Sequence, residues 1–345
     1  MKELKTLVRK NIYSLKPYSS ARNEFKGEAS IFIDANENPY DTPYNRYPDP
    51  LQLQVKEKIS KLKGVAVENI FLGVGSDEPI DLLYRIFCEP QTDNVVSLEP
   101  TYGMYSVCAD INNVEYRKVS LKADYQFSAE ELLSASDENS KIIWLCSPNN
   151  PTGNALNPVE VEKVLQNFQG IVVLDEAYID FSSQPSYLQK LKDYPNMVVL
   201  QTFSKAWGSA GVRLGMAFAS PDIISIFNKV KYPYNVNILT QRYAIKLLDN
   251  FASVEKKVKE ILKNREKLIK SLSKVKCITE IYPTDANFVL VKTTDADAIY
   301  NYLINKGIVA RNRNGITLCD NCIRITVGTA VENKQVISAL KTYKK

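Results

Sequence analysis

Short apolar segments alternate with helical segments from about residue 51 to residue 201, and this alternation constrains the fold more than any other feature of the sequence. Strands are predicted near 69–72, 94–98, 116–120, 141–146, 170–174 and 197–201, and helices near 51–63, 79–88, 104–111 and 158–168. Short apolar strands alternating with helices are typical of a mostly parallel sheet covered on both faces. We therefore expect an α/β fold that binds its ligands at the carboxyl ends of the strands.

Polar segments follow three of these strands directly. They occupy residues 147–153, 175–178 and 202–205, so three strand ends are expected to converge on one place. A glycine turn at 73–78 leads from another strand into a helix, whose free backbone N–H groups favour a phosphate. Ser76 and Asp77 in this turn could equally be plain helix caps.

The regular alternation of strands and helices ends at about residue 231. Two consecutive helices are predicted at 237–249 and 253–274, followed by short strands, another helix and a closing helix. This pattern indicates a smaller α+β domain. We predict an N-terminal arm at 1–45 that contributes to the small domain, a large cofactor-binding domain at 46–235 and a small C-terminal domain at 236–345.

The chain of 345 residues contains no histidine, and this absence excludes several kinds of chemistry. Ser-His-Asp and Cys-His nucleophile systems, HExxH metalloproteases and most zinc hydrolases all require histidine. A GxxxxGK[ST] phosphate loop is also missing, which argues against P-loop nucleotide hydrolysis. Proton transfer must therefore involve Lys, Tyr, Asp, Glu, Cys or a cofactor.

Charge and hydropathy argue against nucleic acid and membranes as partners. The net charge of +5 comes from 44 basic and 39 acidic residues and is too mild and too mixed to indicate nucleic acid. We expect no membrane segment and a cytoplasmic location, because no run of eighteen apolar residues and no signal peptide is present. Cys319 and Cys322 have CxxC spacing without a second pair, so no metal site is predicted.

One lysine stands out at the end of the last predicted strand. Lys205 follows the hydroxyl-bearing Thr202 and Ser204 and precedes Arg213. A lysine amine becomes a covalent catalyst when a carbonyl cofactor captures it as a Schiff base, and a phosphate on that cofactor would need hydroxyls and a fixed cation nearby. By themselves these residues also fit a surface loop with an incidental lysine.

The motifs at the strand ends, taken as a set and in order, resemble those of the fold-type I, class II pyridoxal-phosphate-dependent aminotransferases. The set consists of Gly75-Ser-Asp-Glu78, Pro100-Thr-Tyr102-Gly-Met-Tyr105, Asn150-Pro-Thr-Gly153, Asp175-Glu-Ala-Tyr178, Ser204-Lys205 and Arg213. More narrowly, the sequence resembles the histidinol-phosphate aminotransferase family. That likeness is carried by Pro17-Tyr18-Ser-Ser-Ala-Arg22, Asn45-Arg-Tyr47-Pro48, Pro100-Thr-Tyr-Gly-Met-Tyr-Ser106, Cys146-Ser-Pro-Asn-Asn-Pro-Thr-Gly153 and Cys322-Ile-Arg324-Ile-Thr-Val-Gly-Thr329.

The resemblance implies a role for each cofactor residue. Lys205 would hold pyridoxal 5'-phosphate as an internal aldimine and then shuttle the substrate proton. Asp175 would pair with the ring nitrogen, Tyr178 and Asn150 with the ring's phenolic oxygen, and Tyr102 would lie on the ring. The cofactor phosphate would meet Gly75, Ser76, Asp77, Thr202, Ser204 and Arg213, together with Tyr47 from the partner subunit of a homodimer.

The resemblance also implies substrate residues and a reaction. Arg324 would bind the acidic end of the substrate, and Arg311 and Tyr18 would bind the phosphate of histidinol phosphate. The implied reaction is a ping-pong transfer from L-histidinol phosphate to 2-oxoglutarate, giving imidazole acetol phosphate and L-glutamate in histidine biosynthesis. A threonine-phosphate decarboxylase or an aromatic amino acid aminotransferase on the same scaffold remains an alternative, and a regulator without catalysis is disfavoured because no segment is left for a DNA-reading domain.

Overall fold

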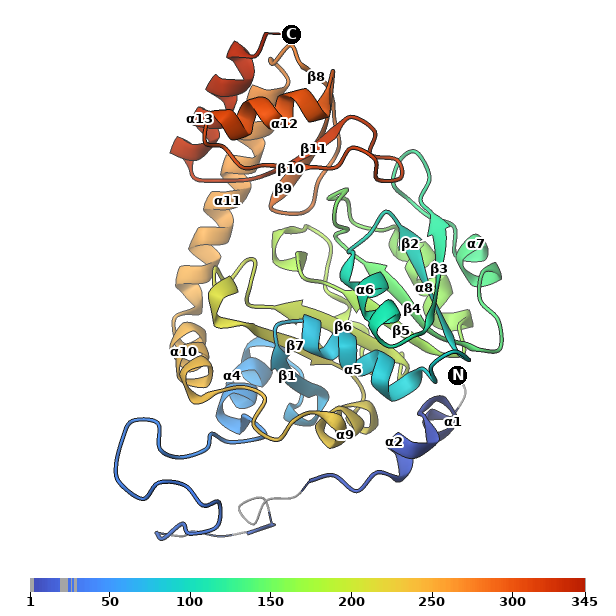
Figure 1. Cartoon of the computed structure of the whole chain (residues 1–345), viewed down its shortest axis with the longest axis vertical. Helices are drawn as coiled ribbons and strands as arrows, with labels where there is room; N and C mark the ends of the chain where they lie inside the picture. Colours follow the sequence, from blue (N-terminus) through green and yellow to red (C-terminus); the bar gives the residue numbers. More distant parts are fainter. Residues whose placement is uncertain (1–2, 19–23, 26, 28–29, 345) are drawn as a thin grey trace.

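A computed structural model of the chain describes residues 3–18, 24–25, 27 and 30–344 and divides them into two bodies joined by one long helix (Figure 1). The larger body contains a sheet of β1 (Ile70–Val74), β2 (Asn94–Glu99), β3 (Glu115–Ser120), β4 (Ser140–Cys146), β5 (Ile171–Asp175), β6 (Met197–Thr202) and β7 (Leu214–Phe218). Its helices are α1 (Leu4–Leu7), α2 (Lys10–Ser14), α4 (Leu53–Lys63), α5 (Asp77–Phe87), α6 (Met104–Ile111), α7 (Ala129–Ser134), α8 (Pro158–Asn167), α9 (Pro221–Val230) and α10 (Ile238–Asp249).

The large sheet is mostly parallel, as the sequence predicts. Its strand order is β1-β7-β6-β5-β4-β2-β3, and β2 to β6 all pair in parallel where they are neighbours. The strand β7, which was not predicted, runs antiparallel to both β6 and β1. The carboxyl ends of β4, β5 and β6 therefore lie side by side at one edge of the sheet.

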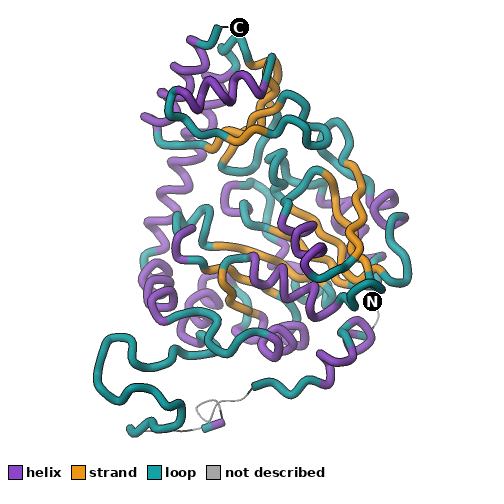
Figure 2. The backbone as a smooth tube through the Cα atoms, in the orientation of Figure 1, coloured by secondary structure: helices purple, strands orange, loops and turns teal. Residues whose placement is uncertain are grey.

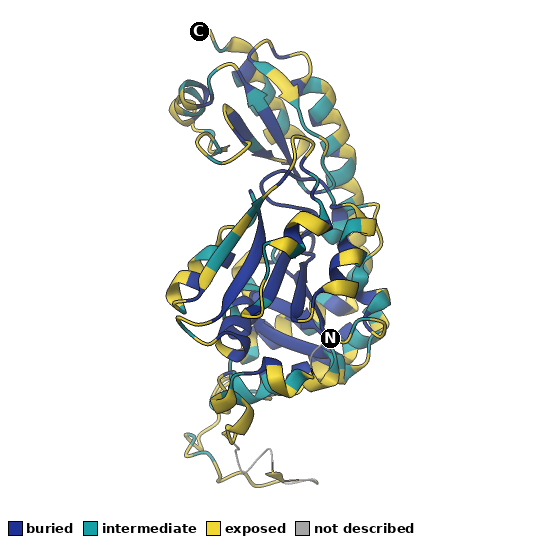
Figure 3. Cartoon of the chain, turned by 90° about the vertical axis from the view of Figure 1, so that its right-hand side faces the viewer, coloured by how far each residue is buried: buried dark blue, intermediate teal, exposed yellow. Residues whose placement is uncertain are grey.

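Alternation along the central strands creates two hydrophobic cores, one on each face of the sheet. In β4, Ile142 and Trp144 pack in the core with α5, α6 and α9, whereas Ile143 and Leu145 pack in the core with α4, α7 and α8. Because successive side chains of a strand point to opposite faces, a strand buried on both faces is apolar throughout. The dark central strands in Figure 3 show this burial.

The smaller body is built on an antiparallel sheet of order β10-β11-β9-β8. Its elements are α11 (Phe251–Leu272), β8 (Ile278–Ile281), β9 (Phe288–Thr293), α12 (Ala296–Asn305), β10 (Arg311–Asn312), β11 (Cys322–Thr326) and α13 (Ala330–Thr342). Leu268 and Leu272 of α11 pack in the core of this body, while Val254 at the other end of α11 packs in a core of the large body. The helix α11 is therefore shared by the two bodies.

The position of the N-terminal arm differs from the prediction that it contributes to the small domain. Leu7 and Val8 pack in the core under α5 and α9, and Arg9 pairs with Glu89 of the large body at 3.1 Å. Residues 30–52 contain no helix or strand and extend from the side of the large body opposite to the small one (Figures 1 and 2). Apolar burial of α1 on the large body decides this placement.

The boundary predicted at 235/236 also lies too early. Helix α10 packs against α4 of the large body, so the small body begins within α11. The arm returns to the large body near Pro50, whose carbonyl oxygen accepts a hydrogen bond from Lys231 Nζ at 2.8 Å. The predicted motif at 17–22 runs into residues 19–23, which lie outside the described residues.

Candidate active site

A cleft of about 700 Å³ opens between the carboxyl ends of β4, β5 and β6 and the smaller sheet. The residues predicted from sequence that line it are Ser76, Asp77, Tyr102, Asn150, Asp175, Tyr178, Thr202, Ser204, Lys205, Arg213, Arg311 and Arg324. Segments that are far apart in the sequence thus meet where the strand-end rule places a ligand.

Lys205 follows the buried strand β6 and lines this cleft. The turn that carries it is anchored because Phe203 N–H donates to Leu214 O at 3.0 Å and the Phe203 ring packs on Trp207. Its Nζ lies 5.5 Å from the centre of the Tyr178 ring. Burial, and then repulsion from Arg324, lowers the pKa of Lys205, so a larger fraction of its amine is neutral near pH 7 than in a free lysine.

Asp175 is the last residue of β5 and is only 2% exposed. Its Oδ2 accepts a hydrogen bond from the Tyr105 hydroxyl at 2.6 Å, and its Oδ1 accepts one from the Ala177 N–H at 3.0 Å. Burial raises the pKa of Asp175, while the bond from Tyr105 opposes this effect. Asp175 is thus an acid held at the base of the cleft with a fixed orientation.

Asn150 and Tyr178 form one polar wall of the cleft. Asn150 Nδ2 donates to the Tyr178 hydroxyl at 3.5 Å, and Asn150 Oδ1 accepts a hydrogen bond from Arg324. The Tyr178 ring packs edge-on against Phe288 at 5.2 Å, and burial raises the pKa of its hydroxyl. The wall therefore combines residues of the large body with Phe288 and Arg324 of the small one.

The turn between β1 and α5 forms a cradle for an anion. Gly75 has φ of +69°, and a Cβ there would lie 2.6 Å from the Arg213 guanidinium, so any larger residue would displace that cation. Arg213 Nη2 pairs with Asp77 Oδ2 at 3.1 Å, and Ser76 is the N-cap of α5. Free N–H groups at this helix start and the nearby guanidinium together favour a phosphate.

Two hydroxyls and an aromatic ring complete this end of the cleft. Thr202 Oγ1 donates to Ser204 Oγ at 3.0 Å and accepts from the Ser204 N–H at 3.1 Å. The Tyr102 hydroxyl donates to Asp77 Oδ1 at 3.1 Å, and its ring lies edge-on to Tyr105 at 5.6 Å. Tyr102 is therefore fixed at both its ring and its hydroxyl.

Two residues that the sequence predicts for the site do not lie with the others in the cleft of this chain. Tyr18 is 71% exposed and Tyr47 is 50% exposed, and neither lines the cleft. Tyr47 instead stacks on Tyr234 with ring centres 4.3 Å apart. Tyr18 belongs to the predicted arm, and Tyr47 lies in segment 30–52, which extends from the far side of the large body.

The structure adds two residues that the sequence reasoning missed as site residues. Tyr105 lies in the motif 100–105, and no local sequence signal connects it with Asp175. Arg313 lines the cleft beside Arg311 and Arg324. A sequence signal was its spacing of two from Arg311, which puts both side chains on one face where the extended backbone continues past β10.

Other kinds of site are not found in the part of the chain that the structure describes. No group of three or more His, Cys, Asp or Glu residues there could hold a metal ion, and Cys319 and Cys322 are buried free thiols. None of the described helices is both long and apolar enough to cross a membrane.

Comparisons with known proteins agree with this geometry. A family model described as aminotransferase class I and II matches residues 21–340. The histidinol-phosphate aminotransferase of Bacteroides thetaiotaomicron is 59% identical over 344 residues, which cover 99% of each chain.

Solved structures share the fold. That of histidinol-phosphate aminotransferase from Sinorhizobium meliloti, in complex with pyridoxal-5'-phosphate, has a TM-score of 0.79 at 25% identity and covers 86% of this chain and 82% of that one. That of L-threonine-O-3-phosphate decarboxylase from Porphyromonas gingivalis has a TM-score of 0.72 at 22% identity, covers 86% and 90%, and shows a shared fold. With its two-body architecture, its Lys205 cleft and a near full-length relative at 59% identity, the chain belongs to the aminotransferase class I and II family.

Proposed function

We propose that this chain is a pyridoxal 5'-phosphate-dependent aminotransferase of histidine biosynthesis. It converts L-histidinol phosphate and 2-oxoglutarate into imidazole acetol phosphate and L-glutamate. The observation that carries this proposal is the meeting of the Lys205 amine, the buried Asp175 carboxylate and a group of arginines in one cleft. The near full-length likeness to a histidinol-phosphate aminotransferase supports the choice of substrate.

The residues of the cleft fit the cofactor. Its phosphate would be held by the start of α5, by Arg213 and by the hydroxyls of Thr202 and Ser204. The absence of a Cβ at Gly75 leaves room for the Arg213 guanidinium beside that helix start. Asp175, a buried acid at the base of the cleft, would pair with the ring nitrogen.

The chain's own residues prepare the reaction in distinct ways. When bound, pyridoxal 5'-phosphate supplies an electron sink for the substrate carbon that loses its proton. The lowered pKa of Lys205 favours the neutral form of Nζ, and in that form the amine can accept that proton and return it. Asp175, oriented by the Tyr105 hydroxyl, would stabilise positive charge on the ring nitrogen, and Asn150 and Tyr178 would hydrogen-bond the ring's oxygen.

The substrate end of the cleft carries the binding cations. Arg324 and Arg311 are opposite partners in the β10–β11 pair, so both guanidinium groups face the same side of the small sheet. A guanidinium suits bidentate contact with either a carboxylate or a phosphate, which allows the same site to accept glutamate and a phosphorylated amine in turn.

We also propose that the active unit is a homodimer in which Tyr47 reaches the partner's cleft. Several large apolar side chains are exposed on the arm and near α10, namely Tyr40, Tyr44, Tyr47, Tyr232, Leu239 and Tyr243. Arg242 of α10 donates to Pro43 O at 3.5 Å, which places the arm beside that helix. Exposed apolar surface of this kind is typical of a protein–protein contact, and a second copy is the partner this family implies.

The proposal is tested by an amino-donor screen with the purified holoenzyme. L-Histidinol phosphate and L-glutamate should each convert the cofactor to its amino form, seen as a change in its visible absorbance, and phenylalanine, aspartate and threonine phosphate should be poorer. Release of carbon dioxide from threonine phosphate, or preference for phenylalanine, would reject the assignment. In the same assay Lys205→Ala should retain bound cofactor but lose at least about 100-fold in turnover, since proton transfer by a positioned group contributes about 10²- to 10⁴-fold.

A further inference from the structure

Three arginines lie on the face of the small sheet that borders the cleft. Arg311 stands opposite Arg324 in the β10–β11 pair, and the Arg313 N–H donates to Cys322 O at 2.9 Å, so the pairing continues past β10. Side chains two residues apart on a strand share a face. Arg313 therefore projects to the same side as Arg311 and Arg324, and all three line the cleft.

Arg313 has no anionic partner within the described residues. Its Nε is buried without a hydrogen bond, and no ion pair connects it with a described carboxylate. Burial, followed by repulsion from Arg324 and Arg311, lowers the pKa of Arg313 to about 10. A half-buried cation beside two others destabilises the protein unless an anion binds there.

The backbone on either side of Arg313 is firmly held. Asn312 Nδ2 donates to Asp297 Oδ1 at 2.6 Å, and Asn314 Nδ2 donates to Asp297 Oδ2 at 2.7 Å. The nearby carboxylate of Asp297 is thus used by the two flanking amides. This arrangement fixes the strand and leaves the Arg313 guanidinium available to a ligand in the cleft.

We propose that Arg313 is a specificity-determining residue that recognises the phosphate of the phosphorylated amine substrate. This inference rests on the proposed function and names a residue of its substrate end. One bidentate guanidinium satisfies a carboxylate, whereas a phosphate monoester carries about two negative charges and three acceptor oxygens. Arg324 already donates to Asn150, so a third guanidinium supplies bonds that a phosphate needs and a carboxylate does not.

The test compares the Arg313→Gln holoenzyme with wild type on two donors. We expect KM for L-histidinol phosphate and the inhibition constant of inorganic phosphate to rise about 10- to 100-fold, the loss typical of hydrogen bonds to a charged group. KM for L-glutamate should change less than about threefold. Without phosphate, the melting temperature of Arg313→Gln should equal or exceed that of wild type, because an unpaired cation has been removed.

Two further variants sharpen the result. Arg85→Gln removes the same group from the exposed side of α5 and should leave both KM values and phosphate inhibition unchanged. Arg313→Lys keeps the charge without the planar fork and should have an intermediate phosphate inhibition constant. Equal losses on both donors, or unchanged phosphate inhibition in an active Arg313→Gln enzyme, would overturn the inference. If wild type cannot use L-histidinol phosphate, the proposed function itself fails.

Discussion

Tyr105 contacts Asp175 at the base of the cleft. It is fully buried and stacks on Trp144 with ring centres 4.6 Å apart, and its hydroxyl donates a hydrogen bond to Asp175. Burial alone favours the neutral form of Asp175, and the Tyr105 hydrogen bond opposes this by stabilising the carboxylate. Tyr105 is therefore a positioning residue that favours the carboxylate form of Asp175 and fixes its orientation.

We expect Tyr105→Phe to weaken cofactor binding and slow turnover, each by about tenfold, because a hydrogen bond to a charged group contributes roughly 1.5–3 kcal/mol. Cofactor affinity is measured by titrating the apoenzyme with pyridoxal 5'-phosphate, and the pH dependence of the bound cofactor's absorbance reports on the ring nitrogen. Tyr84→Phe is the matched control, since Tyr84 is a buried tyrosine that donates to Tyr105 O and not to Asp175. Equal effects of the two variants on cofactor affinity would contradict this role.

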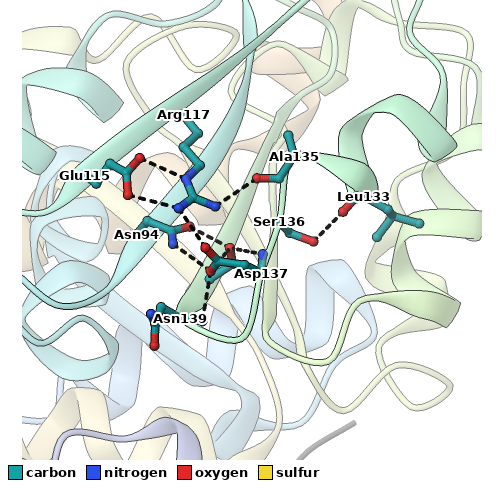
Figure 4. A network of polar contacts seen from close by, with 9 residues as sticks. Asn94, Glu115, Arg117, Leu133, Ala135, Ser136, Asp137 and Asn139 are labelled. Carbon is teal, nitrogen blue, oxygen red and sulfur yellow. Dashed lines mark hydrogen bonds and ion pairs between the residues drawn. The ribbon is translucent and has the colours of Figure 1, made fainter.

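At the scale of elements, the edge of the sheet opposite the cleft is held by a polar network (Figure 4). It connects the starts of β2, β3 and β4. Asp137 accepts hydrogen bonds from Asn94 Nδ2 and the Asn139 N–H, each at 2.9 Å, and pairs with Arg117 at 2.7 Å. Arg117 also bonds Glu115 and the Ala135 carbonyl. The network stabilises the strands without contacting the cleft.

These bonds make the stability of the protein depend on pH in a predictable direction. Hydrogen bonds from Asn94 and Arg117 lower the pKa of Asp137 to about 2, below its ordinary value of 3.8. A lowered acidic pKa contributes stability above the unfolded value and loses it as pH falls towards the folded value. Asp137→Asn should therefore have a lower urea midpoint than wild type at pH 6, and the difference should shrink from pH 4 towards pH 2.

Activity separates this structural effect from a catalytic one. Asp137→Asn should keep wild-type kcat and KM at pH 7.5 and 25 °C. Glu130→Gln removes an acidic side chain from the neighbouring helix α7. This variant should keep the wild-type urea midpoint from pH 6 to pH 2. A midpoint difference for Asp137→Asn that stays constant down to pH 2 would show that the carboxylate's charge is not the cause.

At the scale of the whole molecule, the two bodies meet around the loop that carries Asn150. The Asp285 N–H donates to Gly153 O at 2.7 Å, and Asp285 Oδ2 accepts from the Ala155 N–H at 2.9 Å. Arg265 of α11 adds hydrogen bonds to Phe181 O in the large body and Ala286 O in the small one. The small body is thereby anchored beside the strand ends, which brings its arginines to the cleft.

The homodimer proposal predicts complementation between two inactive or impaired chains. Lys205→Ala lacks the amine in its own cleft, and Tyr47→Phe lacks the hydroxyl that it would supply to its partner. A mixed dimer has one site with Lys205 from one chain and Tyr47 from the other, so mixing the two variants should restore up to about half of the wild-type activity of that dimer. Activity is measured before and after the subunits exchange.

The control for this experiment uses the same arm. Tyr44→Phe is an exposed arm tyrosine without a proposed role in the site and should be as active as wild type before mixing. A single-chain molecular mass in solution, or a lack of restored activity in verified mixed dimers, would reject the crossing of Tyr47.

Much of the fold and of the cofactor site follows from the sequence alone. Apolar strands at regular intervals indicate a parallel sheet buried on both faces, and parallel strands end at one edge, so Asn150, Asp175 and Lys205 had to lie near one another. This reasoning succeeds because the apolar pattern of each strand is local and a helical crossover between two strands makes them parallel. Arg311 and Arg324 are assigned to the substrate from the family resemblance alone, and the structure shows that they share one face of the small sheet.

Only the tertiary structure decided the contacts between distant segments. The arm packs on the large body, the division between the bodies lies within α11, and Tyr105 is 70 residues away from the Asp175 that it orients. Arg313 becomes informative only when the small sheet places it beside two other cations and leaves it without an acid. The sequence therefore determines where a ligand binds, because the pattern of apolar strands is set by residues that are neighbours in the chain. Only the packing of remote elements determines the charge and the hydrogen bonding of the site, because these interactions act between residues that are far apart in the sequence.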